Sequence, residues 1–335
     1  MNNKSHQNRK FTETRRLAPD SDHIQHNEEN DGIDRRGFLQ CMAWAGTGML
    51  WTVAGGVLGS RILGPTTAAA EEVGDFSFVQ ISDSHIGFNK PANTDVAGTL
   101  KQAIARINAL PKAPDFILHT GDLTHLAEPG EFDTLDQLLK SAKAGQIFYV
   151  PGEHDVVSDN GKEFLARHGK STKGHGWFSF DQRGVHFIGL VNVFDIAEGA
   201  LGTLGEEQLA WLKDDVGSLS SSTPIVVFAH VPLWSIYPQW GWGTQDAERA
   251  LGLLKRFGSV TVLNGHIHQT VKKVEGNITF HTARSTAFPQ PKPGSAPKAG
   301  PMKVEPAILP SVLGITEVRY VESDHNLAVV DSALG

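Results

Sequence analysis

A carboxylate and an imidazole stand two residues apart at the end of a short apolar run. The run Phe78-Val79-Gln80-Ile81 is typical of a buried strand, and Asp83 and His85 follow it closely. Residues i and i+2 of an extended backbone lie on the same face, so Asp83 and His85 are expected to project together beyond the strand. Such a pair suits a divalent metal ion of the Zn, Fe or Mn kind. Taken alone, the pair also fits a polar turn.

Four further apolar runs end in residues that can bind a metal ion or carry a proton. They span residues 115–120, 146–150, 224–229 and 260–264, and each is expected to form a strand. The residues that follow them are, in order, Asp122; Glu153, His154 and Asp155; His230; and His266 and His268. Ligands of open α/β sheets bind at the carboxyl ends of strands, where these side chains would meet.

Helix-like segments separate the first three strands. Residues 92–110 have apolar side chains at helical spacing, with Thr94 or Asp95 as the N-cap, and residues 129–142 predict a second helix. The alternation of strand and helix predicts an α/β fold with a parallel sheet. The later segments predict hairpins at 176–191 and 271–283, helices at 205–216 and 247–257, a surface loop at 289–310, and closing strands at 315–322 and 326–330.

The first 70 residues differ in composition from the rest of the chain. Residues 1–34 are polar and charged without an apolar period, and we expect them to be disordered. Residues 35–70 contain Arg35-Arg36-Gly37-Phe38-Leu39, an apolar run and then Ala68-Ala69-Ala70. This segment resembles a twin-arginine (Tat) signal, which predicts export by the Tat machinery to the periplasm or beyond, with cleavage of the signal. An uncleaved membrane anchor is the alternative. Residues 71–335 are expected to form one catalytic domain.

The charge and cysteine content of residues 71–335 narrow the possible partners and ligands. Of 30 basic and 37 acidic residues, 8 and 7 precede residue 71, which leaves 22 and 30 and a net charge of −8. This balance disfavours nucleic acid as a partner. The only cysteine, Cys41, lies in the signal segment, so a metal site must be built from nitrogen and oxygen ligands.

Together, the five motifs resemble the calcineurin-like metallophosphoesterase superfamily over roughly residues 76–281. The pattern of that superfamily is Asp-x-His, Gly-Asp, Gly-Asn-His-Asp/Glu, a lone His and Gly-His-x-His, in this order. The resemblance implies a double β-sandwich flanked by helices. It also implies two divalent or trivalent transition-metal ions at the strand ends, with Fe, Mn or Zn expected. The implied reaction is hydrolysis of a small phosphate ester by metal-activated water.

The ligand set of the superfamily carries over residue by residue. The resemblance assigns Asp83, His85 and His268 to the first metal. It assigns His230 and His266 to the second metal, and Asp122 as the carboxylate that bridges the two. It implies that His154 contacts the phosphoryl group and the leaving oxygen. It also implies that Asp155 orients His154.

Two positions depart from the superfamily pattern. Glu153 stands where the superfamily has Asn, so it offers the second metal a carboxylate in place of a neutral carbonyl oxygen, or else swings away. His125 stands three residues after Asp122, where purple acid phosphatases have a metal-binding Tyr. It is either an extra nitrogen ligand or a loop histidine that hydrogen-bonds to nearby backbone.

The resemblance favours an exported phosphomonoesterase. A phosphodiesterase or cyclic nucleotide hydrolase is one alternative, and a catalytically degenerate metal-binding envelope protein is another, because of Glu153. The aromatic run at 234–243 either stacks on a substrate or closes the core. His119 is expected to be a core histidine, and a surface or structural role is expected for His168, His175, His186, His281 and His325.

Overall fold

A computed structural model of the 335-residue chain describes residues 49–54, 57–62, 75–194, 200–321 and 326–335. The predicted disordered leader, the Arg35-Arg36 pair and His325 lie outside these residues. Within the apolar run, β1 (Met49–Ala54) and β2 (Val57–Ile62) pair as an antiparallel hairpin. In the described part of the chain, no helix has both the length and the apolar character that a membrane crossing requires.

A five-stranded sheet contains the first three predicted strands. Its order is β13-β12-β3-β4-β5. These strands are β3 (Phe76–Ile81), β4 (Phe116–His119), β5 (Gln146–Tyr149), β12 (Gly314–Val321) and β13 (Asn326–Ala333). β3, β4 and β5 are parallel, as the alternation of strand and helix predicted, whereas β12 runs antiparallel to both β3 and β13.

A six-stranded sheet contains the two predicted hairpins. Its order is β10-β11-β9-β8-β7-β6. The strands are β6 (Phe178–Gln182), β7 (Val185–Gly189), β8 (Ile225–Ala229), β9 (Val260–Asn264), β10 (Lys272–Glu275) and β11 (Ile278–Thr282). The hairpins β6–β7 and β10–β11 are antiparallel, and the strands between them pair in parallel.

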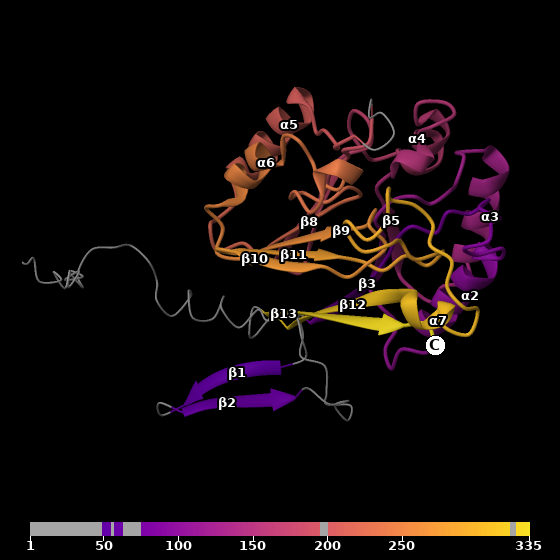
Figure 1. Ribbon diagram of the computed structural model, residues 1–335. Coiled ribbons are helices and arrows are strands. Elements are labelled where there is room, and N and C mark those ends of the chain that lie inside the picture. The colour runs from indigo at the N-terminus through magenta and orange to yellow at the C-terminus, as the bar shows by residue number, and fades with distance from the viewer. Residues whose placement is uncertain (1–48, 55–56, 63–74, 195–199, 322–325) are drawn as a thin grey trace, which may run out of the picture. The chain divides into compact units, whose positions relative to one another are not determined.

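Helices cover the outer face of each sheet (Figure 1). The helices α2 (Val96–Asn108) and α3 (Pro129–Leu139) pack on the five-stranded sheet. The helices α5 (Glu206–Gly217) and α6 (Ala247–Leu254) pack on the six-stranded sheet. Four other helical segments among the described residues were not predicted, namely α4 (Lys162–His168), α7 (Leu309–Val312) and the 3-10 turns η1 (Glu153–Asp155) and η2 (Pro238–Trp240).

Local sequence explains where these helices begin and how they associate. The Asp95 side chain caps α2 by accepting a hydrogen bond of 2.8 Å from the Gly98 N–H, which settles the choice between the two predicted caps.

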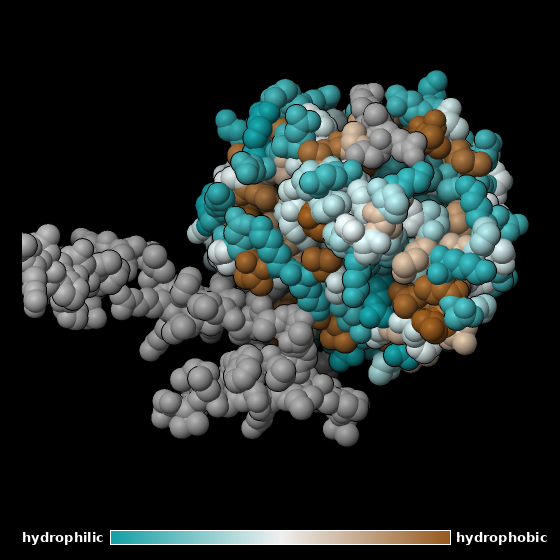
Figure 2. All heavy atoms as spheres, viewed as in Figure 1, coloured by the Kyte–Doolittle hydropathy of each residue, from teal (hydrophilic) through white to brown (hydrophobic). Residues whose placement is uncertain are grey.

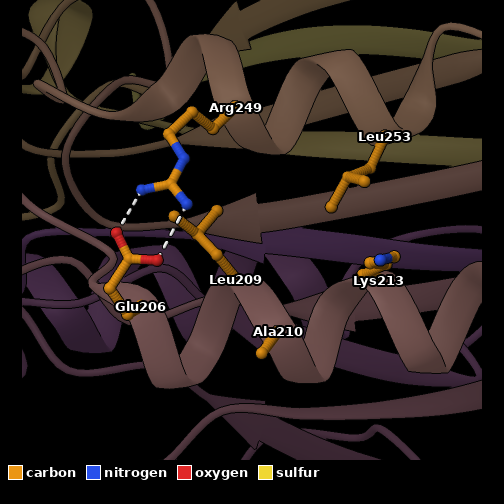
Figure 3. Close-up of a pocket in the computed structure, with 6 residues that line it drawn as sticks. All are labelled: Glu206, Leu209, Ala210, Lys213, Arg249 and Leu253. Atoms are coloured by element: carbon orange, nitrogen blue, oxygen red, sulfur yellow. Dashed lines mark hydrogen bonds and ion pairs between the residues drawn. The ribbon is translucent and has the colours of Figure 1, made fainter.

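On the outer surface, Arg249 of α6 forms a two-point ion pair with Glu206 of α5 beside a shallow pocket (Figure 3). Both side chains are largely exposed, so this pair adds little to stability.

An aromatic core fills the space between the two sheets. Phe78 and Phe116 of one sheet stack at 4.9 Å, and Phe187 of the other meets both edge-on at 5.4 and 5.3 Å. The face seen in Figure 2 is mostly hydrophilic, with small scattered apolar groups. Two face-to-face sheets between two helical layers confirm the predicted double β-sandwich.

Candidate metal centre

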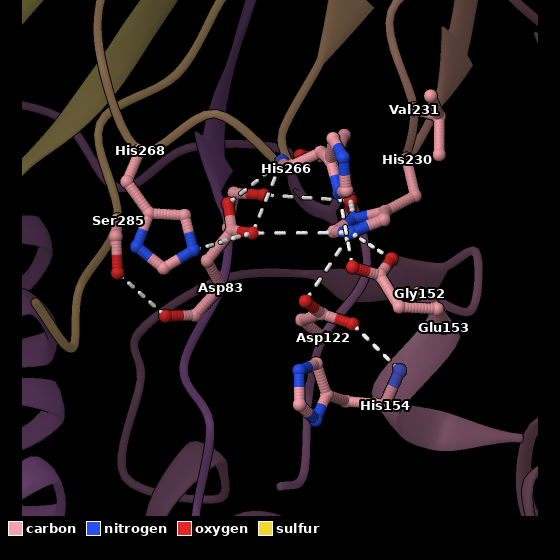
Figure 4. Close-up of polar contacts among 12 residues, drawn as sticks. Asp83, Asp122, Gly152, Glu153, His154, His230, Val231, His266, His268 and Ser285 are labelled. Atoms are coloured by element: carbon pink, nitrogen blue, oxygen red, sulfur yellow. Dashed lines mark hydrogen bonds and ion pairs between the residues drawn. The ribbon is translucent and has the colours of Figure 1, made fainter. Parts of the chain in front are cut away.

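The carboxyl ends of five strands present the predicted site residues (Figure 4). Asp83 and His85 follow β3, Asp122 follows β4, and a 3-10 turn, η1 (Glu153–Asp155), follows β5. On the other sheet, His230 follows β8, and His266 and His268 follow β9. The seven residues predicted as metal ligands fall into two adjoining groups of side chains.

The first group consists of Asp83, His85, Asp122 and His268, whose candidate ligand atoms all lie within 4.8 Å of one another. The His268 Nε2 atom is 3.2 Å from Asp83 Oδ1 and 3.2 Å from His85 Nε2. All four residues are buried. Two imidazoles and two carboxylates at this spacing suit a transition-metal ion.

The second group consists of Glu153, His230 and His266. Glu153 joins the two imidazoles, because Oε2 lies 2.9 Å from His230 Nε2 and Oε1 lies 3.0 Å from His266 Nδ1. Glu153 therefore does not swing away from the site. Its carboxylate occupies the position predicted for a ligand of the second metal.

Asp122 lies between the two groups. Its Oδ2 atom is 3.4 Å from His85 Nε2 and 3.3 Å from His230 Nε2, so one carboxylate oxygen faces ligand atoms of both groups. The Oδ1 atom accepts a hydrogen bond of 3.0 Å from the His154 backbone N–H, which fixes the carboxylate. This arrangement is compatible with a dinuclear site that has a shared carboxylate.

Backbone carbonyl groups orient two of the imidazoles. His230 donates its Nδ1–H to the Thr120 carbonyl at 2.7 Å, and His268 donates its Nδ1–H to the Phe288 carbonyl at 2.5 Å. In each ring the Nε2 atom is left to face the carboxylates. A histidine that binds a metal is commonly held in this way, since the hydrogen bond at one nitrogen fixes the tautomer and the ring orientation.

Burial and neighbouring charges set the protonation of the imidazoles. Burial, with His154 and His268, lowers the pKa of His85 well below its ordinary value, so this ring is neutral and its lone pair can bind a cation. Burial alone would also lower the pKa of His230, but Asp122 and Glu153 outweigh it and raise this pKa well above the ordinary value. A metal ion that binds at His230 must therefore displace a proton.

The strand ends approach one another closely because glycine precedes three of the five polar motifs, at Gly121, Gly152 and Gly265. At Gly152, an added Cβ would collide with the Asp122 side chain and backbone N–H. At Gly121, whose φ is +95°, an added Cβ would collide with His230 Nδ1. Residues with side chains are thereby excluded from the positions that bring β4, β5 and β8 together.

Five ligand-type residues themselves have left-handed backbone conformations. The φ angles are 54° at Asp83, 41° at His85, 51° at Asp122, 70° at His266 and 54° at His268. Asp and His occupy this region more readily than most residues, although it remains unfavourable for them. Such backbone strain is concentrated at functional sites, where the surrounding structure maintains it.

Residues 76–270 match the calcineurin-like phosphoesterase family, which is more than half of the chain. The chain belongs to this family. The protein is therefore a hydrolase that acts on phosphoric ester bonds, as the sequence motifs predicted.

Relatives of this phosphoesterase include both phosphodiesterases and phosphatases. The chain is 26% identical over 221 residues to a probable glycerophosphodiester phosphodiesterase of Arcobacter nitrofigilis, across 62% of this chain and 77% of that protein. It is 25% identical over 218 residues to a 3',5'-cyclic-nucleotide phosphodiesterase of a Nostoc species, across 63% and 79%. It is 28% identical over 226 residues to the serine/threonine-protein phosphatase CPPED1 of Danio rerio, across 58% and 71%.

Solved structures with the same fold include two phosphatases. A purple acid phosphatase from yellow lupin has a TM-score of 0.57 at 14% identity, across 83% of this chain and 56% of that chain. A dimetal phosphatase from Danio rerio has a TM-score of 0.51 at 13% identity, across 78% and 99%. At this level of identity the likeness shows the fold of the phosphoesterase alone.

The surroundings of His154 correct one prediction for the phosphoesterase. Asp155 was expected to orient His154, but the His154 Nδ1–H donates to the His125 carbonyl at 2.7 Å instead. The Asp155 carboxylate accepts hydrogen bonds from the backbone N–H groups of Leu123, Thr124 and Gly152 and from the Thr124 hydroxyl. Asp155 therefore acts on His154 only indirectly, because it holds the loop that presents the His125 carbonyl.

His125 lies outside both metal groups. One of its ring nitrogens lies within 4.8 Å of ring nitrogens of His85 and His154, and those three form a separate cluster. The sequence had left open whether His125 is an extra ligand of the metal centre or a loop residue. The structure places its ring against His154, on the side of the first metal group.

The aromatic run at 234–243 closes the core of the phosphoesterase. Trp234 packs against Phe280, and Trp240 and Trp242 pack against Ile267, which lies between His266 and His268. These three tryptophan side chains are buried. The structure thus favours the structural alternative for the run, which supports the loop carrying His266 and His268 from beneath.

Proposed function

We propose that the protein hydrolyses phosphomonoesters with two transition-metal ions held by the two groups of side chains. The arrangement that carries the proposal is the Asp122 carboxylate, which faces the imidazoles of both groups at 3.3 and 3.4 Å. Fe, Mn and Zn suit the nitrogen and oxygen ligands of both groups.

The chemistry of the buried atoms fits such ions. The His230 Nε2 atom and both ring nitrogens of His266 have no hydrogen-bond partner among the described residues, although Glu153 lies at ion-pair distance from His230 Nε2 and His266 Nδ1. Buried polar atoms are rarely left without a partner. A cation coordinated by these atoms supplies the missing interaction.

Different residues of this chain are proposed to hold the metal ions, to orient His154 and to transfer a proton. When bound, two cations would supply Lewis acidity and would lower the pKa of a water molecule, which makes it a nucleophile for the phosphate ester. The His125 carbonyl fixes the proton on His154 Nδ1, so Nε2 of His154 is the atom left to contact a phosphoryl oxygen. Burial lowers the pKa of His154, but Asp122 and Glu153 outweigh it and raise this pKa above its ordinary value, so the ring can also carry a proton on Nε2. In that protonated form His154 can give the Nε2 proton to the leaving oxygen and keep the proton on Nδ1.

Glu153 is proposed as a ligand of the second ion. Its two carboxylate oxygens face His230 and His266 at 2.9 and 3.0 Å. A carboxylate in place of a neutral amide oxygen adds one negative charge, which favours a more highly charged ion and weakens the net attraction for phosphate.

The preference for monoesters is supported by the two imidazoles, His125 and His154, that adjoin the first metal group. Relatives named as phosphodiesterases make diester hydrolysis the competing proposal. The deciding experiment loads the purified protein with Mn, Zn or Fe, counts the ions per chain, and compares turnover of p-nitrophenyl phosphate with turnover of bis-p-nitrophenyl phosphate.

We expect two ions per chain and faster turnover of the monoester. Faster turnover of the diester would establish the competing proposal. Bound metal without turnover of either ester would instead favour a metal-binding envelope protein that lacks catalysis, and the absence of any bound ion would contradict both proposals.

We also propose export through the Tat pathway, which rests on Arg35-Arg36-Gly37-Phe38-Leu39 and the small residues at 68–70. Changing Arg35 and Arg36 to Lys should leave the protein inside the cell, as fractionation of cells would show. Undiminished export of that variant would contradict the pathway. Retention of the unchanged protein in the membrane would indicate the uncleaved anchor.

A further inference from the structure

The His125 ring lies against His154, the residue proposed to contact the substrate phosphate. It stacks on the His154 ring at 4.7 Å with 19° between the planes, and it meets the His85 ring at 5.7 Å. The Nδ1 atom of His125 has no hydrogen-bond partner among the described residues. His125 therefore lies beside the proposed phosphate-contacting residue with a polar atom unused.

Two carboxylates hold the loop that carries His125. Asp155 accepts hydrogen bonds from Thr124, as described above. Glu131 Oε2 accepts hydrogen bonds from the backbone N–H groups of His125 at 3.2 Å and Leu126 at 2.8 Å. The backbone on both sides of His125 is thus fixed, which is how a side chain is preorganised to bind a ligand.

A lysine extends this side of the site. The Lys90 Nζ atom lies 5.9 Å from the centre of the Phe88 ring, and the same Phe88 ring meets His125 edge-on at 5.1 Å. Lys90 is exposed, and none of the carboxylates in the described part of the chain forms an ion pair with it. The Lys90 charge is close enough to contribute, after burial and His154, to lowering the pKa of His125 to about 4.

We propose that His125 and Lys90 form a substrate-binding arm beside the first metal group that selects phosphate groups with two negative charges. His125 donates a hydrogen bond to a phosphoryl oxygen, and the Lys90 ammonium attracts the second charge. A phosphomonoester carries two charges near neutral pH and a diester carries one, so the arm favours the monoester. This inference rests on the proposed function and names the residues that give it specificity.

Two substitutions test the arm without dismantling the site. His125→Phe keeps a ring to stack on His154 and removes the donor, and Lys90→Gln removes the charge. Lys90→Arg restores the charge, while Lys213→Gln removes an exposed charge from α5 as a matched control. Each metal-loaded variant is assayed for kcat/KM with both nitrophenyl esters, for its metal content and for the Kd of inorganic phosphate by calorimetry.

We expect His125→Phe and Lys90→Gln each to lower kcat/KM for the monoester roughly ten-fold, the usual size of one charge-assisted contact. The value for the diester should change less than about two-fold, and the Kd of phosphate should rise in parallel with the loss on the monoester. Lys90→Arg and Lys213→Gln should stay close to the unchanged protein.

Equal losses on both esters, or no loss on either, would overturn the inference. A loss of one metal ion in His125→Phe would also overturn it, because His125 would then be a ligand. If the unchanged protein turns over neither ester, the proposed function fails, and the phosphate titrations alone decide. In that case phosphate binding weakened by both variants supports the arm, and unaltered binding refutes it.

Discussion

The metal centre and the β6–β7 hairpin both bury a histidine among carboxylates, but they use its two nitrogens differently. At the metal centre, His230 and His268 each give one nitrogen to a backbone carbonyl and keep the other facing the site. In the hairpin, both nitrogens of His186 are taken, by Asp181 at 2.7 Å and by Asp215 at 3.0 Å. A nitrogen left over for a ligand, rather than burial or nearby negative charge, distinguishes the two regions.

A third histidine also pairs with a carboxylate away from the metal centre, but through Nε2 alone, since its buried Nδ1 atom has no hydrogen-bond partner among the described residues. His281 of β11 lies 2.9 Å from Asp331 Oδ1, and Asp331 belongs to β13 of the other sheet. The pair therefore joins the two sheets, as a structural role requires. His186 and His281 thus have the structural role that the sequence predicted for each of them.

The largest effect is expected from the proposed acid at the metal centre. His154→Ala should lower kcat by about 10²–10⁴-fold, the usual contribution of acid–base groups, while the metal content stays unchanged. Because His154 also lies near Asp122 and Glu153, loss of an ion from this variant would show that it is a ligand. His186→Gln, assayed in parallel, should retain full activity per bound metal.

A change at His186 should affect stability rather than catalysis. His186→Gln removes an imidazolium bonded to two carboxylates and should lower the free energy of unfolding by about 1–3 kcal/mol, as urea titration would measure. Reduced activity of the folded variant would argue that the hairpin histidine contributes to the site after all.

The contacts of His186 with Asp181 and Asp215 also predict that the stability of the folded chain depends on pH. Burial lowers the pKa of His186, but the hydrogen bonds that it donates to Asp215 and Asp181 outweigh it and raise this pKa above the ordinary value of 6.5. Its contribution to stability is therefore complete below pH 6.5 and is lost as the pH rises through the raised value. The difference in unfolding free energy between the unchanged protein and His186→Gln should shrink with rising pH, and a constant difference would contradict this.

A smaller effect is expected at Glu153. Glu153→Asn keeps an oxygen near His230 and His266 but removes one negative charge, so the relative affinity for divalent over trivalent ions should increase. Activity with the preferred ion should change less than about ten-fold, because a ligand atom is retained. Metal titrations that match those of the unchanged protein would mean that Glu153 is not a ligand.

The smallest effect is expected far from both regions. Arg249→Ala breaks the ion pair with Glu206, whose side chains are 56% and 81% exposed. Exposed pairs contribute little, so neither the Tm nor the activity should change measurably. A clear drop in Tm would show that α5 and α6 depend on this pair more than its exposure suggests.

Spacing along the sequence predicted the site because each motif directly follows a strand. Once the apolar runs were identified as strands, their shared carboxyl ends determined that Asp83, Asp122 and His230 would meet. The left-handed backbone at these ends and the choice of ring nitrogen come from tertiary packing. The sequence therefore could not show that His154 is held by the His125 carbonyl rather than by Asp155.

The missed elements lacked the usual local signals. The helix α4 begins after Gly161, which has a φ of 75° and no side chain, so the usual capping residue is absent directly before the helix. The Asp159 carboxylate, two residues earlier, accepts hydrogen bonds from the N–H groups of Lys162 and Glu163 instead. The strands β7, β8 and β9 were predicted individually, but their parallel pairing depends on crossovers that periodicity does not reveal. The fold class could still be predicted because it depends only on the order of the elements.

The left-handed backbone at five ligand-type residues has a consequence for the lifetime of the folded chain. Each such residue costs on the order of 1 kcal/mol, a substantial sum beside the roughly 5–15 kcal/mol that holds a domain folded. An ion that binds only the folded chain raises the free energy of unfolding, and the increase grows with the logarithm of the ion concentration. The supply of metal would then set the fraction of molecules that stays folded, and so how much protein survives proteolysis, before any substrate arrives.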